Sequence, residues 1–181
     1  MDTLETIVDY LNQHEITLAT AESCTAGLIV SELARVPGSG ACIDCGLAVY
    51  SPESKNRYLK VSFDTIEEFG LTSEEVALEM VEGAINRNNA DAALSNTGVA
   101  GPGSADDGTP EGRVCFGWAI RTSDEVVTFS EARDFDGDRN KVRLAAAHYS
   151  LERLMHYHAQ AANQGNQRRI QHSYKEASSN G

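Results

Sequence analysis

The feature that most constrains the fold of this chain is an alternation of short apolar segments with amphipathic ones. Three segments are typical of buried strands: residues 16–22 (ITLATAE), 43–51 (IDCGLAVYS) and 91–98 (DAALSNTG). Two more, residues 113–122 and 125–135, predict a hairpin. Strands that alternate with helices favour a mixed sheet covered on both faces. We therefore expect an α/β fold, a three-layer α/β/α sandwich in one domain.

The segments around these strands have the spacing and the terminal residues of helices. The expected helices cover residues 4–11, 24–36, 52–61, 73–90 and about 138–158. Pro52 suits the first position of its helix, because proline has no backbone N–H to leave unpaired there. Thr72 and Glu75 have the spacing of a capping box at the start of the fourth helix.

The domain is expected to end before the C-terminus. From Asn163 the chain is polar and poor in apolar residues, a composition that cannot bury enough surface to order itself. We therefore predict a domain over residues 1–160 and a disordered tail over residues 161–181.

Composition and charge exclude several classes of protein. With 181 residues, 41% hydrophobic and 23% charged, the chain can bury a core of ordinary size. Its net charge of −12 would repel phosphate backbones, so no direct nucleic-acid partner is expected. The start, MDTLETIVDY, lacks the pattern of a secretory signal, and no apolar run reaches the ~18 residues of a membrane span. A cytoplasmic protein without a membrane partner is the expectation.

The four cysteines give little support to a metal or redox site. Cys42 and Cys45 form a CxxC, but no second pair completes a four-ligand zinc site. The pair leads into a strand, whereas a thioredoxin-like pair opens a helix. We predict neither a metal site nor a cofactor.

The joint between the first strand and the second helix carries reactive side chains, Glu22, Ser23 and Cys24. The Ser23 hydroxyl could simply cap the helix. It could also be a nucleophile, because unpaired backbone N–H groups at a helix start stabilise an oxyanion. The backbone N–H groups of Cys24 and Thr25 are then the candidate donors. A Cys24 thiolate is an alternative nucleophile at the same place.

A serine nucleophile needs a base that removes its proton. The five histidines lie outside the strand ends and are expected to be solvated surface residues. Lys55 follows the second strand by about one helical turn, and enclosure in a dry cleft would lower its pKa from about 10.4 toward about 7–8. An exposed helix lysine is the alternative. Tyr50, at the end of that strand, could orient the serine, relay a proton or merely pack.

The glycine-rich segment NTGVAGPG, residues 96–103, could let backbone approach a ligand. Thr97, Gly98 and Gly101 are its candidate substrate contacts, although the segment could equally be a flexible turn. It matches neither the dinucleotide nor the triphosphate pattern. Three arginines could pair with an anionic ligand in this acidic chain, and Arg139 is the candidate among them: Arg113, Arg139 and Arg143.

Four segments in this order and spacing resemble the CinA C-terminal domain family: TAESCTAG, AVYSPESK, NTGVAGPG and FDGDRNKVR. The resemblance covers about Leu4 to Leu154, and the family includes stand-alone nicotinamide-nucleotide amidases. It implies a mixed five-stranded sheet, a homodimer or higher homo-oligomer, and a pyridine nucleotide as the small-molecule partner. The implied reaction is hydrolysis of the carboxamide of nicotinamide mononucleotide to nicotinic acid mononucleotide and ammonia, without metal.

The family's proposed serine–lysine pair maps onto Ser23 and Lys55, with Tyr50 between them. By that mapping Ser23, and not Cys24, is the nucleophile of an acyl-enzyme mechanism. The resemblance also implies an alternative, because family members are named for competence and DNA damage. A domain of this kind could hold a nucleotide or a protein partner without catalysis.

Two departures from the family pattern bear on the substrate. Ala26 stands where the family commonly has a glycine after TAESCT. The loop after AGP reads GSADDGTPEG in place of the family's glycine-glycine and lysine-proline pairs. Asp106 and Asp107 of that loop would be poor neighbours for a substrate phosphate.

Overall fold

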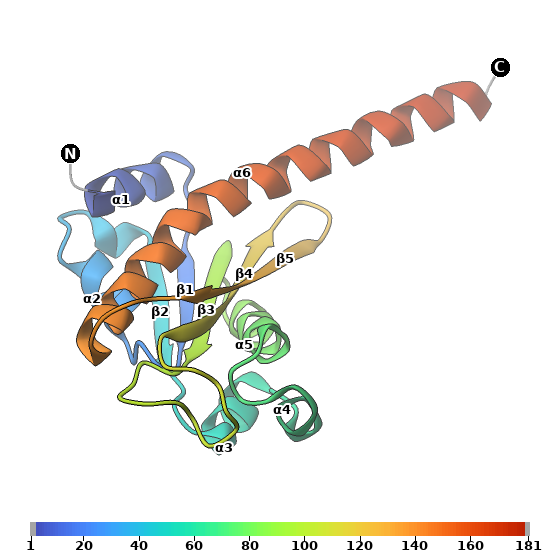
Figure 1. Cartoon of the computed structure of the whole chain (residues 1–181). Coiled ribbons are helices and arrows are strands. Elements are labelled where there is room, and N and C mark those ends of the chain that lie inside the picture. The colour runs from blue at the N-terminus through green and yellow to red at the C-terminus, as the bar shows by residue number, and fades with distance from the viewer. Residues whose placement is uncertain (1–2, 180–181) are drawn as a thin grey trace.

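A mixed five-stranded sheet forms the centre of the molecule in a computed structural model that describes the backbone of residues 3–179 and the side chains of residues 3–163. The strand order is β2-β1-β3-β4-β5 (Figure 1). The strands are β1 (Leu18–Glu22), β2 (Ile43–Ala48), β3 (Ala92–Gly98), β4 (Arg113–Arg121) and β5 (Val126–Asp134). The expected α/β fold and the hairpin of the last two strands are confirmed.

The direction of the strands brings three strand ends to one edge of the sheet. β1 pairs in parallel with β2 and β3, whereas β4 and β5 continue the sheet in antiparallel fashion. Glu22 at the end of β1 aligns with Ala48 of β2 and with Asn96 of β3. All residues of β1 are buried because strands flank it on both sides and helices cover both faces. Ligands of open α/β sheets bind at such an edge.

Helices cover both faces of the sheet (Figure 1). One face carries α1 (Thr3–Gln13), α2 (Leu28–Ala34) and α6 (Arg139–Ser179), and the other carries α4 (Phe63–Phe69) and α5 (Glu74–Arg87). The shorter turns are η1 (Ser39–Ala41), α3 (Pro52–Ser54) and the π-helical turn η2 (Lys55–Leu59). Among the described residues, no helix is both long enough and apolar enough to cross a membrane.

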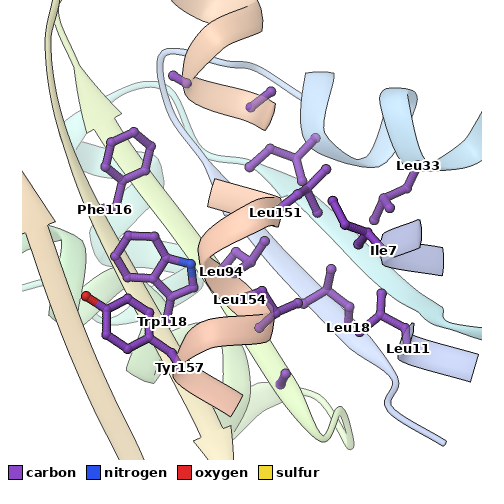
Figure 2. Packing of buried hydrophobic residues seen from close by; sticks show 14 of the residues in the cluster. Ile7, Leu11, Leu18, Leu33, Leu94, Phe116, Trp118, Leu151, Leu154 and Tyr157 are labelled. Atoms are coloured by element: carbon purple, nitrogen blue, oxygen red, sulfur yellow. The ribbon is translucent and has the colours of Figure 1, made fainter. Parts of the chain in front are cut away.

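The larger core lies between the sheet and the helices of one face, where α1 packs beside α6 and α2 (Figure 2). Trp118 of β4 stacks near Phe116 and Tyr157, and its indole N–H donates to the carbonyl of Ser150 at 2.9 Å. A buried tryptophan thereby keeps its one polar atom paired. Leu154 of α6 lies in the same cluster.

Several helix ends differ from the sequence-based expectation. Ser73, not Thr72, caps α5, because its side chain accepts from the Val76 N–H at 3.3 Å. The segment 63–69 forms α4, which the sequence analysis does not predict, with Ser62 as its cap.

Helix α6 continues to Ser179, well past the end expected near residue 158. The segment from Asn163, for which the composition predicts disorder, is helical up to Ser179. It contains no proline that would interrupt a helix. The boundary of the domain at residue 160 stays a prediction.

Candidate active site

Ser23 and Lys55 meet at the edge where the parallel strands end. Lys55 Nζ lies 2.8 Å from Ser23 Oγ, and it also contacts the carbonyl oxygens of Val49 at 2.9 Å and Tyr50 at 3.1 Å. The lysine side chain is 0% exposed and Ser23 is 7% exposed. An exposed helix lysine, the alternative open from the sequence, is excluded by this burial.

Local sequence explains how a lysine reaches this place. Val49 and Tyr50 follow β2, and the Ser51 side chain accepts from the Ser54 N–H at 3.1 Å to cap a short helical turn. Pro52 occupies the first position of that turn, as predicted. Lys55 then lies one turn later and extends back to the end of the strand it follows.

Burial lowers the pKa of Lys55 from its ordinary value to about 8. The three contacts suit both forms of the amine. As an ammonium, Lys55 Nζ donates to Ser23 Oγ and to both carbonyl oxygens. In the neutral form the contact with Ser23 reverses. The carbonyl oxygens of Val49 and Tyr50 can only accept, so they take the two N–H groups that a neutral amine has. The nitrogen lone pair is then left for the Ser23 hydroxyl proton. The geometry therefore suits a base that removes a proton from Ser23.

The backbone after β1 makes a tight turn, the Ser23 turn (residues 23–27), before α2 begins at Leu28. Helix α2 was expected to begin near residue 24, but Ala26 and Gly27 have φ of 53° and 91°. This left-handed backbone delays the helix by one turn. The Ser23 hydroxyl is therefore not a helix cap.

The carboxylate of Glu22 occupies the start of α2. It is 0% exposed and accepts hydrogen bonds from the backbone N–H groups of Gly27 and Ile29 at 2.9 and 3.1 Å. It also accepts from the hydroxyls of Thr20 and Thr25 at 3.0 and 2.7 Å. Since the helix start holds this internal anion, the helix N-terminus itself does not serve Ser23.

The backbone N–H groups of Cys24 and Thr25 remain the candidate oxyanion donors. Within the described part of the chain, neither N–H donates to another residue. The Ser23 N–H, in contrast, donates to the Asn96 carbonyl at 3.1 Å. Donors that lack an internal partner and lie next to a serine suit the negative oxygen of a tetrahedral intermediate.

The thiol of Cys24 does not suit a nucleophile. It is 4% exposed and donates to the side-chain oxygen of Asn96 at 3.3 Å. Burial raises the pKa of this thiol to about 12, which suppresses the reactive thiolate. The two cysteines of the CxxC, Cys42 and Cys45, are also free thiols. The Cys42 thiol donates to the carbonyl of Ser39.

Tyr50 and Arg139 lie together at a distance from the buried pair. The phenol oxygen of Tyr50 accepts from Arg139 at 2.9 Å, and Arg139 also donates to the Gly101 carbonyl. Tyr50 is 57% exposed, and only its carbonyl contacts Lys55. The structure therefore does not bring the phenol between Ser23 and Lys55, because the side chain points from the strand end toward α6 and not inward.

The candidate residues of the glycine-rich segment have structural partners. The Thr97 hydroxyl donates to the Leu71 carbonyl at 2.8 Å. A Cβ at Gly98 would lie 2.8 Å from the Arg113 carbonyl, so only glycine fits there. Gly101 has φ of 88°, and its loop is closed by Glu111, which accepts from the Gly103 N–H at 2.7 Å.

A cavity of about 480 Å³ opens beside the Ser23 turn. Cys24, Tyr50 and Arg139 line it together with residues 98–107 and residues 71–72. Its lining contains one cation, Arg139, and two carboxylates, Asp106 and Asp107. Arg113, another candidate cation, instead pairs with Asp134 and does not line this cavity.

The histidines differ from the expectation of solvated surface residues. His148 contacts Glu32 at 3.0 Å, and His158 contacts the hydroxyl of Tyr10 at 2.8 Å, so both join helices together. Burial lowers the pKa of His158. Among the described residues, no histidine hydrogen-bonds Ser23, which leaves Lys55 as its basic partner.

The sequence draws attention to Glu22, Asn96 and Arg143, but it does not predict that these three residues hold the Ser23 turn. Glu22 accepts hydrogen bonds from the turn and from α2, Asn96 bonds both Cys24 and Thr25, and Arg143 donates to two carbonyls of the turn. A charged residue inside a buried strand was a signal for Glu22, because an unpaired charge cannot stay buried. No local pattern could pair Arg143 with a segment 118 residues away.

Comparison with known proteins places this chain in a family. The model of the CinA C-terminal domain matches residues 1–158. A CinA-like protein of Chlorobaculum tepidum is 44% identical over 146 residues, which are 79% of this chain and 34% of the relative. A putative competence-damage inducible protein of Caldicellulosiruptor saccharolyticus is 41% identical over 150 residues, 83% of this chain and 36% of the relative. The chain thus spans about a third of the length of these curated relatives.

Solved structures agree with the family match over most of both chains. The competence or damage-inducible protein of Enterobacter asburiae has a TM-score of 0.80 at 34% identity, covering 87% of this chain and 99% of its own. A CinA superfamily protein of Escherichia coli has a TM-score of 0.79 at 32% identity, covering 84% and 87%. The chain belongs to the CinA C-terminal domain family.

Proposed function

We propose that this chain is a nicotinamide-nucleotide amidase that hydrolyses the carboxamide of nicotinamide mononucleotide. The observation that carries the proposal is the buried Lys55 Nζ at 2.8 Å from Ser23 Oγ, with two carbonyls on its other sides. A serine with such a base is an activated nucleophile for acyl transfer. The resemblance supplies the substrate class, and the site supplies groups for each step of the chemistry.

In the first step, neutral Lys55 takes the Ser23 proton while Ser23 Oγ attacks the carboxamide carbon. The new oxyanion accepts hydrogen bonds from the N–H groups of Cys24 and Thr25. Lys55 then gives its proton to the leaving nitrogen, the C–N bond breaks, and ammonia departs from an ester on Ser23. Water attacks this ester, losing a proton to Lys55, and Ser23 leaves with that proton as the acid is released.

The two kinds of assistance are comparable in size. Positioned proton transfer contributes about 10²–10⁴-fold and one oxyanion donor about 10²–10³-fold. Neither is sufficient for amide hydrolysis alone, so base and donors must act on the same substrate. Because the pKa of Lys55 is about 8, kcat/KM should rise with pH and level off above that value.

The test is ammonia release from nicotinamide mononucleotide by four variants. Ser23→Ala and Lys55→Met should abolish turnover, while Ser31→Ala and Lys141→Met, exposed residues of α2 and α6, should keep wild-type rates. Circular dichroism and thermal unfolding verify that each variant is folded. Robust turnover by Ser23→Ala refutes the assigned nucleophile, and activity that iodoacetamide abolishes in that variant would transfer the role to Cys24.

A second candidate function is a binding module of the competence or damage type. Relatives that carry this name are about three times longer than the stretch they share with the chain, so a non-catalytic role within a larger system is compatible with the match. Thermal stabilisation by pyridine nucleotides without any ammonia release would favour this function. Turnover that depends on Ser23 would reject it.

A further inference from the structure

Arg143 holds the Ser23 turn from the side of α6. Its Nε donates to the Cys24 carbonyl at 3.0 Å and its Nη2 to the Thr25 carbonyl at 2.8 Å. Arg143 lies one helical turn after Arg139, on the same face of α6. The two arginines therefore hold different parts of the site: Arg139 contacts Tyr50 and the Gly101 loop, and Arg143 contacts the turn.

The position of Arg143 fixes the direction of a backbone N–H. In a trans peptide the C=O and the N–H point in opposite directions. Because the Cys24 carbonyl points at Arg143, the Thr25 N–H of the same peptide points away from it. The next peptide is held in the same manner, since the Thr25 carbonyl faces Arg143 and the Ala26 N–H donates to the Ser23 carbonyl at 3.1 Å.

We propose that Arg143 is a positioning residue that aims the Thr25 N–H at the oxyanion formed by attack of Ser23. The inference rests on the proposed acyl transfer at Ser23. Arg143 itself does not line the cavity beside the turn, so its effect passes through the peptide that it holds. A cation that bonds the carbonyl also polarises the peptide, which strengthens its N–H as a donor.

The opposite side of the turn has its own support. Glu22 accepts from the Thr25 hydroxyl and from the Gly27 N–H, and Asn96 donates to the same hydroxyl at 2.8 Å. Without Arg143 the turn therefore stays attached, and the Thr25 carbonyl still accepts from the Leu28 N–H at 3.2 Å. The Cys24 carbonyl loses its hydrogen bond to Arg143, so the peptide that carries the Thr25 N–H becomes free to rotate. Arginine suits this task because its rigid fork reaches two carbonyls at once, whereas a lysine offers one compact charge.

The expected effect is on the chemical step. Arg143→Gln should lower kcat about 100-fold, the effect of losing one oxyanion donor, with KM changed less than about threefold. The pH at which kcat/KM levels off should stay the same, because Lys55 and its carbonyl partners are unchanged. Arg143→Lys should recover part of kcat by reaching one carbonyl.

The chain offers a matched control in Arg121. Its Nε donates to the Ala90 carbonyl at 3.2 Å and its Nη2 to the Ile85 carbonyl at 2.9 Å, the same two-carbonyl arrangement at the opposite edge of the sheet. Arg121→Gln should lower thermal stability as Arg143→Gln does, yet keep kcat. Equal kcat losses in both variants would show a merely structural role and overturn the inference.

A second measurement separates this inference from the proposed substrate. A fluorophosphonate probe forms a bond from Ser23 Oγ to phosphorus and expels fluoride, through a transition state with a negative oxygen. Mass spectrometry should show wild-type and Arg121→Gln labelled at Ser23 at equal rates and Arg143→Gln labelled about 100-fold more slowly.

The outcomes of the two measurements are distinct. Slower labelling of Arg143→Gln supports the inference even if the wild-type protein releases no ammonia from any nicotinamide compound, a result that would reject only the amidase. Equal labelling of wild-type and Arg143→Gln overturns the inference while the amidase stands. Failure of the wild-type Ser23 to react with the probe overturns the inference as well.

Discussion

Replacing Lys55 by Met should change how the stability of the protein depends on pH. Burial lowers the pKa of Lys55 from 10.5 to about 8 in the folded protein, while the unfolded chain keeps an ordinary lysine. Between these two values the unfolded state binds a proton that the folded state has lost. Stability therefore rises with pH in this window, by about 1.4 kcal/mol per pH unit for one group.

The size of the effect follows from the shift itself. A difference of about 2.5 pKa units corresponds to about 3 kcal/mol, of which about 2.5 kcal/mol falls between pH 7 and pH 10. The Met variant has no proton at this site in either state and lacks the effect. It also leaves the Val49 and Tyr50 carbonyls without their N–H partner, but that loss does not depend on pH.

The assay is urea unfolding of wild-type and Lys55→Met at pH 7 and pH 10. At each pH, the free energy of unfolding of Lys55→Met is subtracted from that of the wild-type protein. The change in this difference from pH 7 to pH 10 is the quantity of interest, because the contributions of other titrating groups cancel in it. Lys141→Met, an exposed lysine of α6, is the control and should show no such change. A pH-independent difference between wild-type and Lys55→Met would mean that Lys55 stays charged in the folded protein, and the proposed base would be lost.

Three further predictions concern the turn and the loop. Glu22→Gln should destabilise the protein by about 3 kcal/mol in urea unfolding, because an amide N–H₂ would face N–H and hydroxyl donors in a buried site; a loss below about 1 kcal/mol would contradict the hydrogen bonds described. Ala26→Gly should raise the free energy of unfolding of the protein by about 1 kcal/mol, because Ala26 has φ of 53°, a left-handed conformation that glycine adopts without strain. A lower melting temperature of the variant would contradict this. The double variant Asp106→Asn, Asp107→Asn should lower KM for nicotinamide mononucleotide by at most about fivefold, because both exposed carboxylates line the cavity and repel the substrate phosphate. KM for the uncharged nicotinamide should stay unchanged. An equal change in KM for both compounds would refute a charge effect.

Local rules made Ser23 and Lys55 candidates, and the family resemblance predicted their pairing. Each residue comes directly after a strand-like segment, and the carboxyl ends of adjacent parallel strands meet at one edge. The sheet and the hairpin were predictable for a similar reason, since burial imposes a regular pattern on each strand.

The features that escaped prediction depend on contacts between distant segments or on backbone geometry. Arg143 reaches the Ser23 turn only because α6 packs beside α2, and nothing near residue 143 signals this. The late start of α2 follows from left-handed backbone at Ala26, which a non-glycine residue seldom adopts. The Tyr50 phenol was misplaced because strand position alone does not fix where a side chain beyond the strand end points.

The order of the chain has a consequence for its synthesis. Ser23 and Lys55 belong to the first third of the chain, whereas Arg139 and Arg143 lie at the start of the last helix. Arg139 contacts the Gly101 loop and Arg143 contacts the Ser23 turn. A nascent chain that has emerged only as far as β5 therefore contains both reactive groups without the arginines that hold their surroundings. By the proposed role of Arg143, the Ser23 hydroxyl acquires its full reactivity only after the ribosome has released the start of α6 and that helix has docked.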